Sequence, residues 1–149
     1  MGGDGGAGSV RAARRAPRLW RMQQLTAGLT AKVQLTVSDA DTAQALGSGD
    51  VPVLGTPRVV ALAEAATVAT TARVLESGQT TVGTRVELDH RSATPVGRTV
   101  VAEALLTKVD GRKLTFEVTV RDGETVAAEG RVERVLVDRH RFVEKATTS

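Results

Sequence analysis

The stretch from Val51 to Ala72 constrains the fold most, because it predicts one long and largely apolar helix. Pro57 suits the first helical position, since proline has no amide hydrogen to lose there, and Thr56 before it suits the N-cap. The apolar positions that follow form a surface too wide for one stripe and too short for a membrane span. These positions are Val59, Val60, Ala61, Leu62, Ala63, Ala65, Ala66, Val68 and Ala69. We therefore expect a core helix that begins at Thr56 and is packed on almost every side.

One ionisable residue, Glu64, interrupts this apolar surface. Its neighbours at helical spacing are Val60, Ala61, Thr67 and Val68, none of them charged. A carboxylate among apolar side chains is costly unless it has a partner or a function. Glu64 is therefore a candidate functional residue.

The segment before the helix predicts a strand and a short connector. From Leu29 to Ser38 apolar and polar residues alternate strictly, which is typical of a half-buried strand. Residues 38–41, with the sequence SDAD, suit the cap of a short helix that runs to Leu46. Residues 47–50, with the sequence GSGD, then break the chain, and we expect this connector to form a flap near Thr56.

The segment after the helix predicts four antiparallel strands. Residues 77–79 (SGQ) suit the helix end, and the next strand begins near Thr80 with Val82, Thr84, Val86 and Leu88 on its apolar side. His90 continues this parity, so its imidazole should point toward the helix. A proline- and glycine-containing turn at 91–97 leads to a strand at 98–109. Asp-Gly pairs at 110–111 and 122–123 then predict two hairpin turns, with a last strand at 125–137.

The element order is strand, helix and four strands, without the strand–helix–strand alternation that a parallel sheet requires. This order predicts an α+β fold. A curved antiparallel sheet wrapped around one central helix is the hotdog fold, and the predicted order fits it.

Length, charge and composition exclude several classes of protein. A chain of 149 residues without cysteine fits one domain with no disulfide and no cysteine-based metal site, and it holds no apolar run of membrane length. Residues 1–24 carry five arginines against Asp4, a charge of +4, so the remaining residues carry −1 of the total of +3. With three aromatic residues, Trp20, Phe116 and Phe142, the chain offers nucleic acid little to stack on. We expect a cytoplasmic protein that binds neither nucleic acid nor membrane.

The ends of the chain differ from its middle. Residues 1–24 are rich in Gly, Ala and Arg and have no period, so we expect a disordered basic tail with no assigned function. We expect one folded domain over residues 25–145 and a flexible C-terminus over 146–149. His140, flanked by Arg139 and Arg141, should be solvated.

Three residues remain that could carry out chemistry: Thr56, Glu64 and His90. Each alone has a simpler explanation, as a helix cap, a solvated helix residue and a core histidine bound to a carbonyl. Together they supply a hydroxyl, a carboxylate about two turns along the helix, and an imidazole from a neighbouring strand. These are the groups that acyl transfer uses, and the helix N-terminus favours negative charge that develops on a carbonyl oxygen. We expect them to line one cleft.

At these residues the sequence resembles the hotdog-fold thioesterases related to fluoroacetyl-CoA thioesterase, over roughly residues 25–145. The similar segments are VLGTPRVVALAEAA, GTRVELDHRSATPVG, VDGRKLTFEV and VERVLVDRHRF. In that family a threonine opens the central helix, a glutamate follows eight residues later, and a histidine precedes an Ala-Thr-Pro turn. These positions are Thr56, Glu64 and His90 here.

The resemblance implies hydrolysis of an acyl-CoA thioester to a free acid and CoA, beside a two-fold interface of a homodimer or tetramer. It implies no metal and no cofactor apart from the CoA of the substrate. His90 would be the general base, with Glu64 orienting it or activating water, while Thr56 would be the nucleophile or position the thioester. The family glycine falls on Gly83, which would allow close approach at the acyl pocket. The Glu-Arg pair falls on residues 133–134, where Arg134 would pair with a CoA phosphate or be a solvated strand residue.

One departure from the family concerns the substrate. The fluoroacetate-specific member has a lid phenylalanine six residues before the threonine, whereas this chain has Asp50 there and no aromatic residue in the connector. A short or medium acyl group is therefore expected in place of fluoroacetyl. A hotdog dimer that binds an acyl thioester or small lipid without cleaving it is the alternative. A hydratase or dehydratase on the same fold is a weaker alternative, because its usual aspartate and histidine on one helix are not found, and Asp89 beside His90 lies on a strand. Nucleic-acid binding is the weakest alternative, because it rests on the tail alone.

Overall fold

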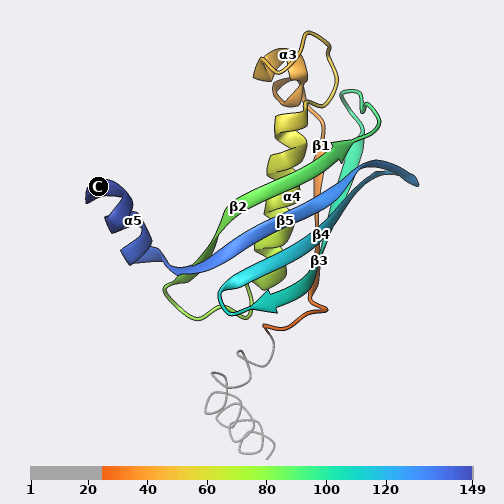
Figure 1. The fold of residues 1–149 in the computed structure, drawn as a ribbon. Helices are drawn as coiled ribbons and strands as arrows, with labels where there is room; N and C mark the ends of the chain where they lie inside the picture. Colours follow the sequence, from red (N-terminus) through yellow and green to blue (C-terminus); the bar gives the residue numbers. More distant parts are fainter. Residues whose placement is uncertain (1–24, 149) are drawn as a thin grey trace, which may run out of the picture.

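The structure, a computed structural model, describes residues 25–148, so the predicted disordered tail at 1–24 lies outside the described residues. A five-stranded antiparallel sheet crosses one long helix, as Figure 1 shows. The elements in chain order are β1 (Thr30–Thr36), the 3₁₀ helix η1 (Asp39–Asp41), α3 (Ala43–Leu46), α4 (Thr56–Thr71), β2 (Gln79–His90), β3 (Thr99–Asp110), β4 (Lys113–Asp122), β5 (Thr125–Asp138) and α5 (Arg139–Thr148). This is the α+β hotdog arrangement that the element order predicts.

The strand order in the sheet is β1-β3-β4-β5-β2. The two hairpins at Gly111 and Gly123 place β3, β4 and β5 side by side, and both glycines have a positive φ, as a tight hairpin turn requires. Among the described residues 25–148, strand β2 pairs with β5 alone and therefore forms one edge of the sheet. An edge strand has a free row of backbone donors and acceptors.

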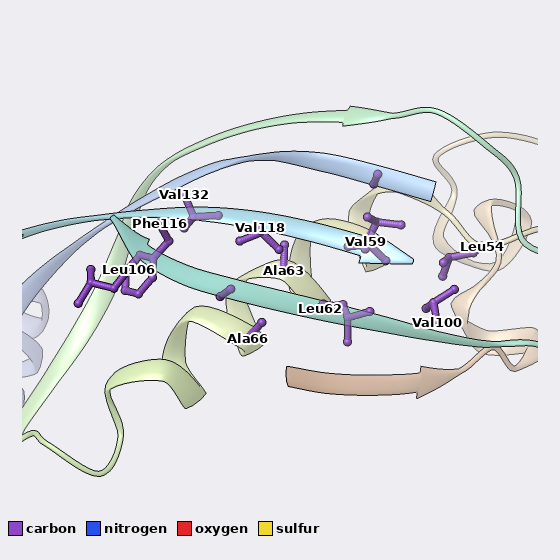
Figure 2. Packing of buried hydrophobic residues seen from close by; sticks show 14 of the residues in the cluster. Leu54, Val59, Leu62, Ala63, Ala66, Val100, Leu106, Phe116, Val118 and Val132 are labelled. Atoms are coloured by element: carbon purple, nitrogen blue, oxygen red, sulfur yellow. The ribbon is translucent and has the colours of Figure 1, made fainter. Parts of the chain in front are cut away.

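The core lies between α4 and the inner face of the sheet. Val59, Leu62, Ala63 and Ala66 line one side of the helix and are buried against strands β3 to β5. Phe116 lies among the sheet residues of this cluster, which Figure 2 shows from close by. Burial of such apolar side chains is the main favourable contribution to the free energy of folding. The predicted core helix is confirmed.

No element of the described range 25–148 covers the opposite side of α4. Ala61 and Ala65 are exposed, and Val68 is 45% exposed. The expectation that the helix is packed on almost every side is therefore wrong for the single chain. A sheet in one layer covers one face of a helix, and the width of the apolar surface predicts a second partner that residues 25–148 do not supply.

Both ends of α4 differ from the prediction. The N-cap is Gly55 and carries no side-chain capping bond, so Thr56 is the first helical residue and not the cap. The helix ends at Thr71, where Ala72 stays in a right-handed conformation. Gly78, expected at the helix end, instead has φ +85° in the turn before β2. The spacing of apolar residues did not distinguish the helix from this turn, so the predicted helix end at residues 77–79 comes after the observed end at Thr71.

A bulge in β2 changes which side chains face the helix. The pairing with β5 shifts between Gly83 and Arg85, so that one residue, Thr84, has no partner across the ladder. Thr81 before the bulge and Val86, Leu88 and His90 after it are the less exposed positions. The expectation that Thr84 faces the helix is wrong, because a bulge reverses the alternation. The inward direction of His90 is retained.

The C-terminus also differs from the prediction. Strand β5 continues into the ten-residue helix α5, which projects away from the sheet and buries none of its residues (Figure 1). Residues 146–148, expected to be flexible, form its last turn, whereas Ser149 lies outside the described residues. The side chain of His140 is 86% exposed, as predicted. Within residues 25–148, no helix has the length and apolar character needed to cross a membrane.

Candidate active site

Thr56 and His90 are in direct contact. The side-chain oxygen Oγ1 of Thr56 lies 2.8 Å from Nδ1 of His90. Thr56 stands on the first turn of α4, and His90 is the last residue of β2, where the strand passes the start of the helix. The hydroxyl that sequence reasoning assigned to a helix cap is therefore engaged with an imidazole.

The two nitrogens of His90 have different surroundings. Nδ1 contacts Thr56, whereas Nε2 is buried and has no hydrogen-bond partner within residues 25–148. Burial lowers the pKa of His90 below 6.5, and the backbone of Ser92 partly offsets this effect. A lowered pKa keeps the imidazole neutral at pH 7, so that one ring nitrogen can accept a proton. The simpler reading of His90, a core histidine satisfied by a carbonyl, does not account for the contact of its ring with the Thr56 hydroxyl.

A pocket of about 290 Å³ opens beside this pair. Its walls are the connector before α4, at residues 48–49, 51 and 53–55, and the turn after β2, at residues 91–93. The two walls are held together, because the amide of Leu54 donates to the carbonyl of Thr94 at 2.9 Å and Val53 bridges to Pro95. The expected flap near Thr56 is thus present.

The connector is also fixed to the start of the helix. Asp41 accepts a hydrogen bond from the Arg58 side chain at 3.1 Å, and its carbonyl accepts from the amide of Gly55 at 2.9 Å. Hydrogen bonds from Ser38 hold the pKa of Asp41 below its usual value, and so does Arg58. The carboxylate is therefore charged at neutral pH and ties η1 to α4.

Glu64 lies away from the Thr56–His90 pair of the same chain. Eight helical residues at 1.5 Å each separate it from Thr56 by about 12 Å along the helix axis. It does not line the pocket beside Thr56 and His90. Its carboxylate oxygen Oε2 instead lies 3.0 Å from Nη1 of Arg134, with 35% of the Glu64 side chain exposed. The expectation that all three residues line one cleft is therefore wrong within a single chain.

Arg134 is an internal residue. Its side chain is 7% exposed, and besides Glu64 it donates from Nε to the Thr81 hydroxyl and from Nη2 to the Thr81 carbonyl, both at 2.8 Å. Burial lowers the pKa of Arg134, and the Glu64 carboxylate opposes that change. The alternative of a solvated strand residue is wrong, and the expected pairing with a CoA phosphate has no support, because the guanidinium is enclosed and already bound.

Gly83 makes room for the Glu64 carboxylate. A β-carbon at residue 83 would collide with Oε2 of Glu64 and would lie 3.3 Å from Nη1 of Arg134. The close approach predicted for this glycine exists, but it is an approach to Glu64. Thr81, which sequence reasoning missed, completes the cluster. The only sequence signal for Thr81 was its position on β2, the strand that pairs with the last strand, β5.

Within residues 25–148, no three His, Asp or Glu side chains gather in an arrangement that could hold a metal ion. The groups present are a hydroxyl bound to a neutral imidazole, and a carboxylate held by an arginine on the same face of the sheet.

The curved sheet around one helix, together with this Thr–His pair, places the chain among the hotdog-fold proteins of the thioesterase type. The sequence model of the fluoroacetyl-CoA-specific thioesterases matches residues 37–140, which is more than half of the chain. The chain belongs to this family, as the sequence motifs predict.

Individual relatives agree with this assignment. The fluoroacetyl-CoA thioesterase of Streptantibioticus cattleyicolor is 37% identical over 90 residues, which are 60% of this chain and 65% of that protein. A crystal structure of the fluoroacetyl-CoA thioesterase covers 84% of this chain and 97% of its own, with 29% identity and a TM-score of 0.78. A thioesterase superfamily member from Thermus thermophilus, 24% identical, shares the fold with a TM-score of 0.75 over 81% of this chain and 90% of its own.

Proposed function

We propose that this chain hydrolyses an acyl-CoA thioester to a free acid and CoA, and that its active site forms between two copies of the chain. The observation that carries this proposal is the state of His90. One nitrogen of its ring meets a hydroxyl at 2.8 Å, while the other is buried without a partner. In hydroxyl–imidazole–carboxylate sites, the second nitrogen donates to a carboxylate that orients the ring.

The base in this proposal is His90. Its neutral ring accepts a proton through Nδ1 from the Thr56 hydroxyl or from a water at that hydroxyl, and the freed oxygen attacks the thioester carbonyl. The carbon–sulfur bond then breaks, and the imidazolium returns its proton to the departing CoA sulfur. If Thr56 attacks first, a water hydrolyses the resulting ester in a second, equivalent step. The N-terminal end of α4 favours the negative charge that develops on the carbonyl oxygen.

We assign the missing carboxylate to Glu64 of the partner subunit, which reaches Nε2 when the residues that cover this nitrogen in the single chain move on association. Strand β2 is an edge of the sheet, so a second copy can pair with it in antiparallel fashion about a two-fold axis. In the register that we propose, the middle of one β2, where Glu64 and Gly83 meet, lies beside the end of the other, where His90 lies. The uncovered side of α4 and the exposed Val51 and Val96 supply apolar area that a dimer could bury.

The acyl group is short or medium in this proposal. The pocket holds about 290 Å³ in one chain. The connector residues that line it are small or aliphatic, and Asp50 stands at the position of the lid phenylalanine. Selectivity for fluoroacetyl is therefore not proposed.

A thiol-release assay over an acyl-CoA panel tests this function. We expect hydrolysis of at least one short or medium acyl-CoA, and a rate about 100-fold lower for His90→Ala, as for loss of a positioned base. His140→Ala is the matched control, because it removes the exposed histidine far from the pocket. If no panel member releases thiol while calorimetry detects intact ligand, the chain is a non-catalytic acyl-thioester-binding protein.

A further inference from the structure

A second hollow, of about 710 Å³, lies at the opposite end of β2 from His90. It forms where the end of β5, the turn between β3 and β4, and helix α5 meet, and Gln79 at the start of β2 also lines it. Two backbone bonds hold this corner together. The amide of Leu136 donates to the carbonyl of Arg112, and the amide of Arg139 donates to the carbonyl of Gly78, both at 2.8 Å.

The lining of this hollow combines cations with an aromatic ring. Arg112, Arg141 and Lys145 line it together with Phe142. Phe142 is 44% exposed, whereas Phe116, the other phenylalanine of the chain, is fully buried. Neither Arg112 nor Arg141 forms a side-chain ion pair with any residue of the described range 25–148. One carboxylate, Asp138, also lines the hollow, and its oxygen accepts the amide of Arg141 at 2.9 Å, which caps α5.

This combination suits a nucleotide with several phosphates. Guanidinium groups bind phosphate oxygens in a two-point geometry, and an exposed aromatic face can stack on a base. The proposed substrate carries such a group, because CoA ends in an adenosine diphosphate with a further 3′-phosphate. Arg134, the cation that the sequence motifs suggested for this group, is buried against Glu64 and Thr81.

We propose that this hollow binds the 3′-phosphorylated adenosine diphosphate end of CoA. The inference rests on the proposed function and extends it. Arg141, Phe142 and Lys145 lie beyond residue 140, where the match to the family model ends.

The hollow serves the active site of the other copy. Within one chain, eleven steps of about 3.3 Å along β2 separate Gln79 from His90 by about 36 Å, too far for one pantetheine arm. In the dimer proposed above, the partner's Gly83 lies beside His90. The partner's Gln79 is four residues further along that strand, a distance of about 13 Å. An extended pantetheine arm spans such a distance.

Two measurements on the full chain test this site. By calorimetry, adenosine 3′,5′-diphosphate should bind the wild type, and Arg141→Glu should weaken that binding at least ~10-fold by reversing a phosphate-binding charge. Arg112→Glu, on a different element, should act in the same way, so that an effect on α5 folding alone cannot explain the loss. Arg121→Glu, an exposed arginine outside the hollow, is the matched control and should bind like the wild type.

The second measurement compares acyl-CoA with the corresponding acyl-pantetheine, which lacks the nucleotide. Arg141→Glu should raise KM for acyl-CoA about 10-fold and leave KM for acyl-pantetheine unchanged. An unchanged KM for acyl-CoA, or an equal rise for both substrates, would overturn the site. Since the calorimetry needs no turnover, nucleotide binding without thiol release would contradict the proposed hydrolysis and leave this site standing.

Discussion

Arg134 on β5 holds the carboxylate of Glu64 on α4, with 3.0 Å between Nη1 and Oε2. The two residues are far apart in the sequence, and they meet because β5 crosses the middle of the helix. Arg134 is in turn fixed by two bonds to Thr81. The guanidinium therefore positions Glu64 and is not placed to contact the substrate.

This relationship predicts the effect of removing the guanidinium. Arg134→Gln should destabilise the fold by ~1–3 kcal/mol, because a half-buried carboxylate loses its partner and Thr81 loses its donors. It should also lower kcat. Arg134→Lys should recover part of kcat, since it restores a charge but not the fork that binds Thr81. Thermal unfolding and thiol release measure the two effects.

The control for this pair is Arg98→Gln, which breaks an exposed ion pair with Asp122 and should change the free energy of unfolding little. If Arg134→Gln unfolded the protein no more readily than Arg98→Gln and left kcat unchanged, the positioning role would be wrong.

Gly83→Ala should separate activity from stability. The added β-carbon meets the end of the flexible Glu64 side chain, which can move away at little cost to the fold. The moved carboxylate would no longer be held in place, so we expect a rate at least ~10-fold lower with a melting temperature close to that of the wild type. Gly49→Ala, in the connector, adds a β-carbon at an ordinary contact of 3.4 Å and should leave the melting temperature unchanged. An unaffected rate for Gly83→Ala would contradict the role given to Glu64.

Thr56→Ala should also affect activity more than stability. The Thr56 side chain makes no capping bond, so its removal should leave the free energy of unfolding within about 0.5 kcal/mol of the wild type. The rate should fall because the hydroxyl beside His90 is lost. Thr42→Ala is the informative comparison, since Thr42 does cap α3 by accepting the amide of Ala45 at 3.1 Å. That variant should lose ~0.5–2 kcal/mol. Capping-type destabilisation in Thr56→Ala with normal kcat would count against our account.

The pH dependence follows from the burial of His90. Burial lowers its pKa below 6.5, so the neutral ring needed as base persists to a more acidic pH than a free histidine would allow. In Glu64→Gln, where burial acts without the partner's carboxylate, the pKa of His90 followed by NMR should therefore lie below 6.5. The free energy of unfolding also depends on this pKa. Because His90 binds its proton more tightly in the unfolded chain, protonation of His90 destabilises the fold as pH falls through this range. A His90 pKa above 6.5 in that variant would contradict the effect of burial.

Much of this architecture could be predicted because it is encoded locally. The alternation in β1, the glycines of both hairpins and the Pro57 helix start are local signals, and each produced the element expected. The bulge at Thr84 could not be predicted, since it depends on how β2 pairs with a strand far along the chain. The ten-residue helix α5 was missed because its sequence is strongly polar and its residues remain exposed.

The candidate site was predicted in part. The contact of Thr56 with His90 followed from the helix start and the inward parity of His90, although the capping role assigned to Thr56 was wrong. The contact of Glu64 was not predicted, because the spacing of residues gives a position along the helix axis but does not give the residue of the sheet that is contacted there. One signal for that partner was present: Arg134 shares the inward parity of the fully buried Val132 on β5, which indicates that its guanidinium points toward the helix.

The central claim is that His90 of one copy works with Glu64 of the other, and mixing two inactive variants tests it most directly. Glu64→Gln and His90→Ala are purified separately, unfolded, mixed in equal amounts and refolded together. Half of the dimers should then be mixed, and each mixed dimer holds one site with both native residues. We predict that thiol release returns to about a quarter of the wild-type rate. Activity that stays at the level of the separate variants, while unmixed wild type recovers fully from the same treatment, would contradict the shared site.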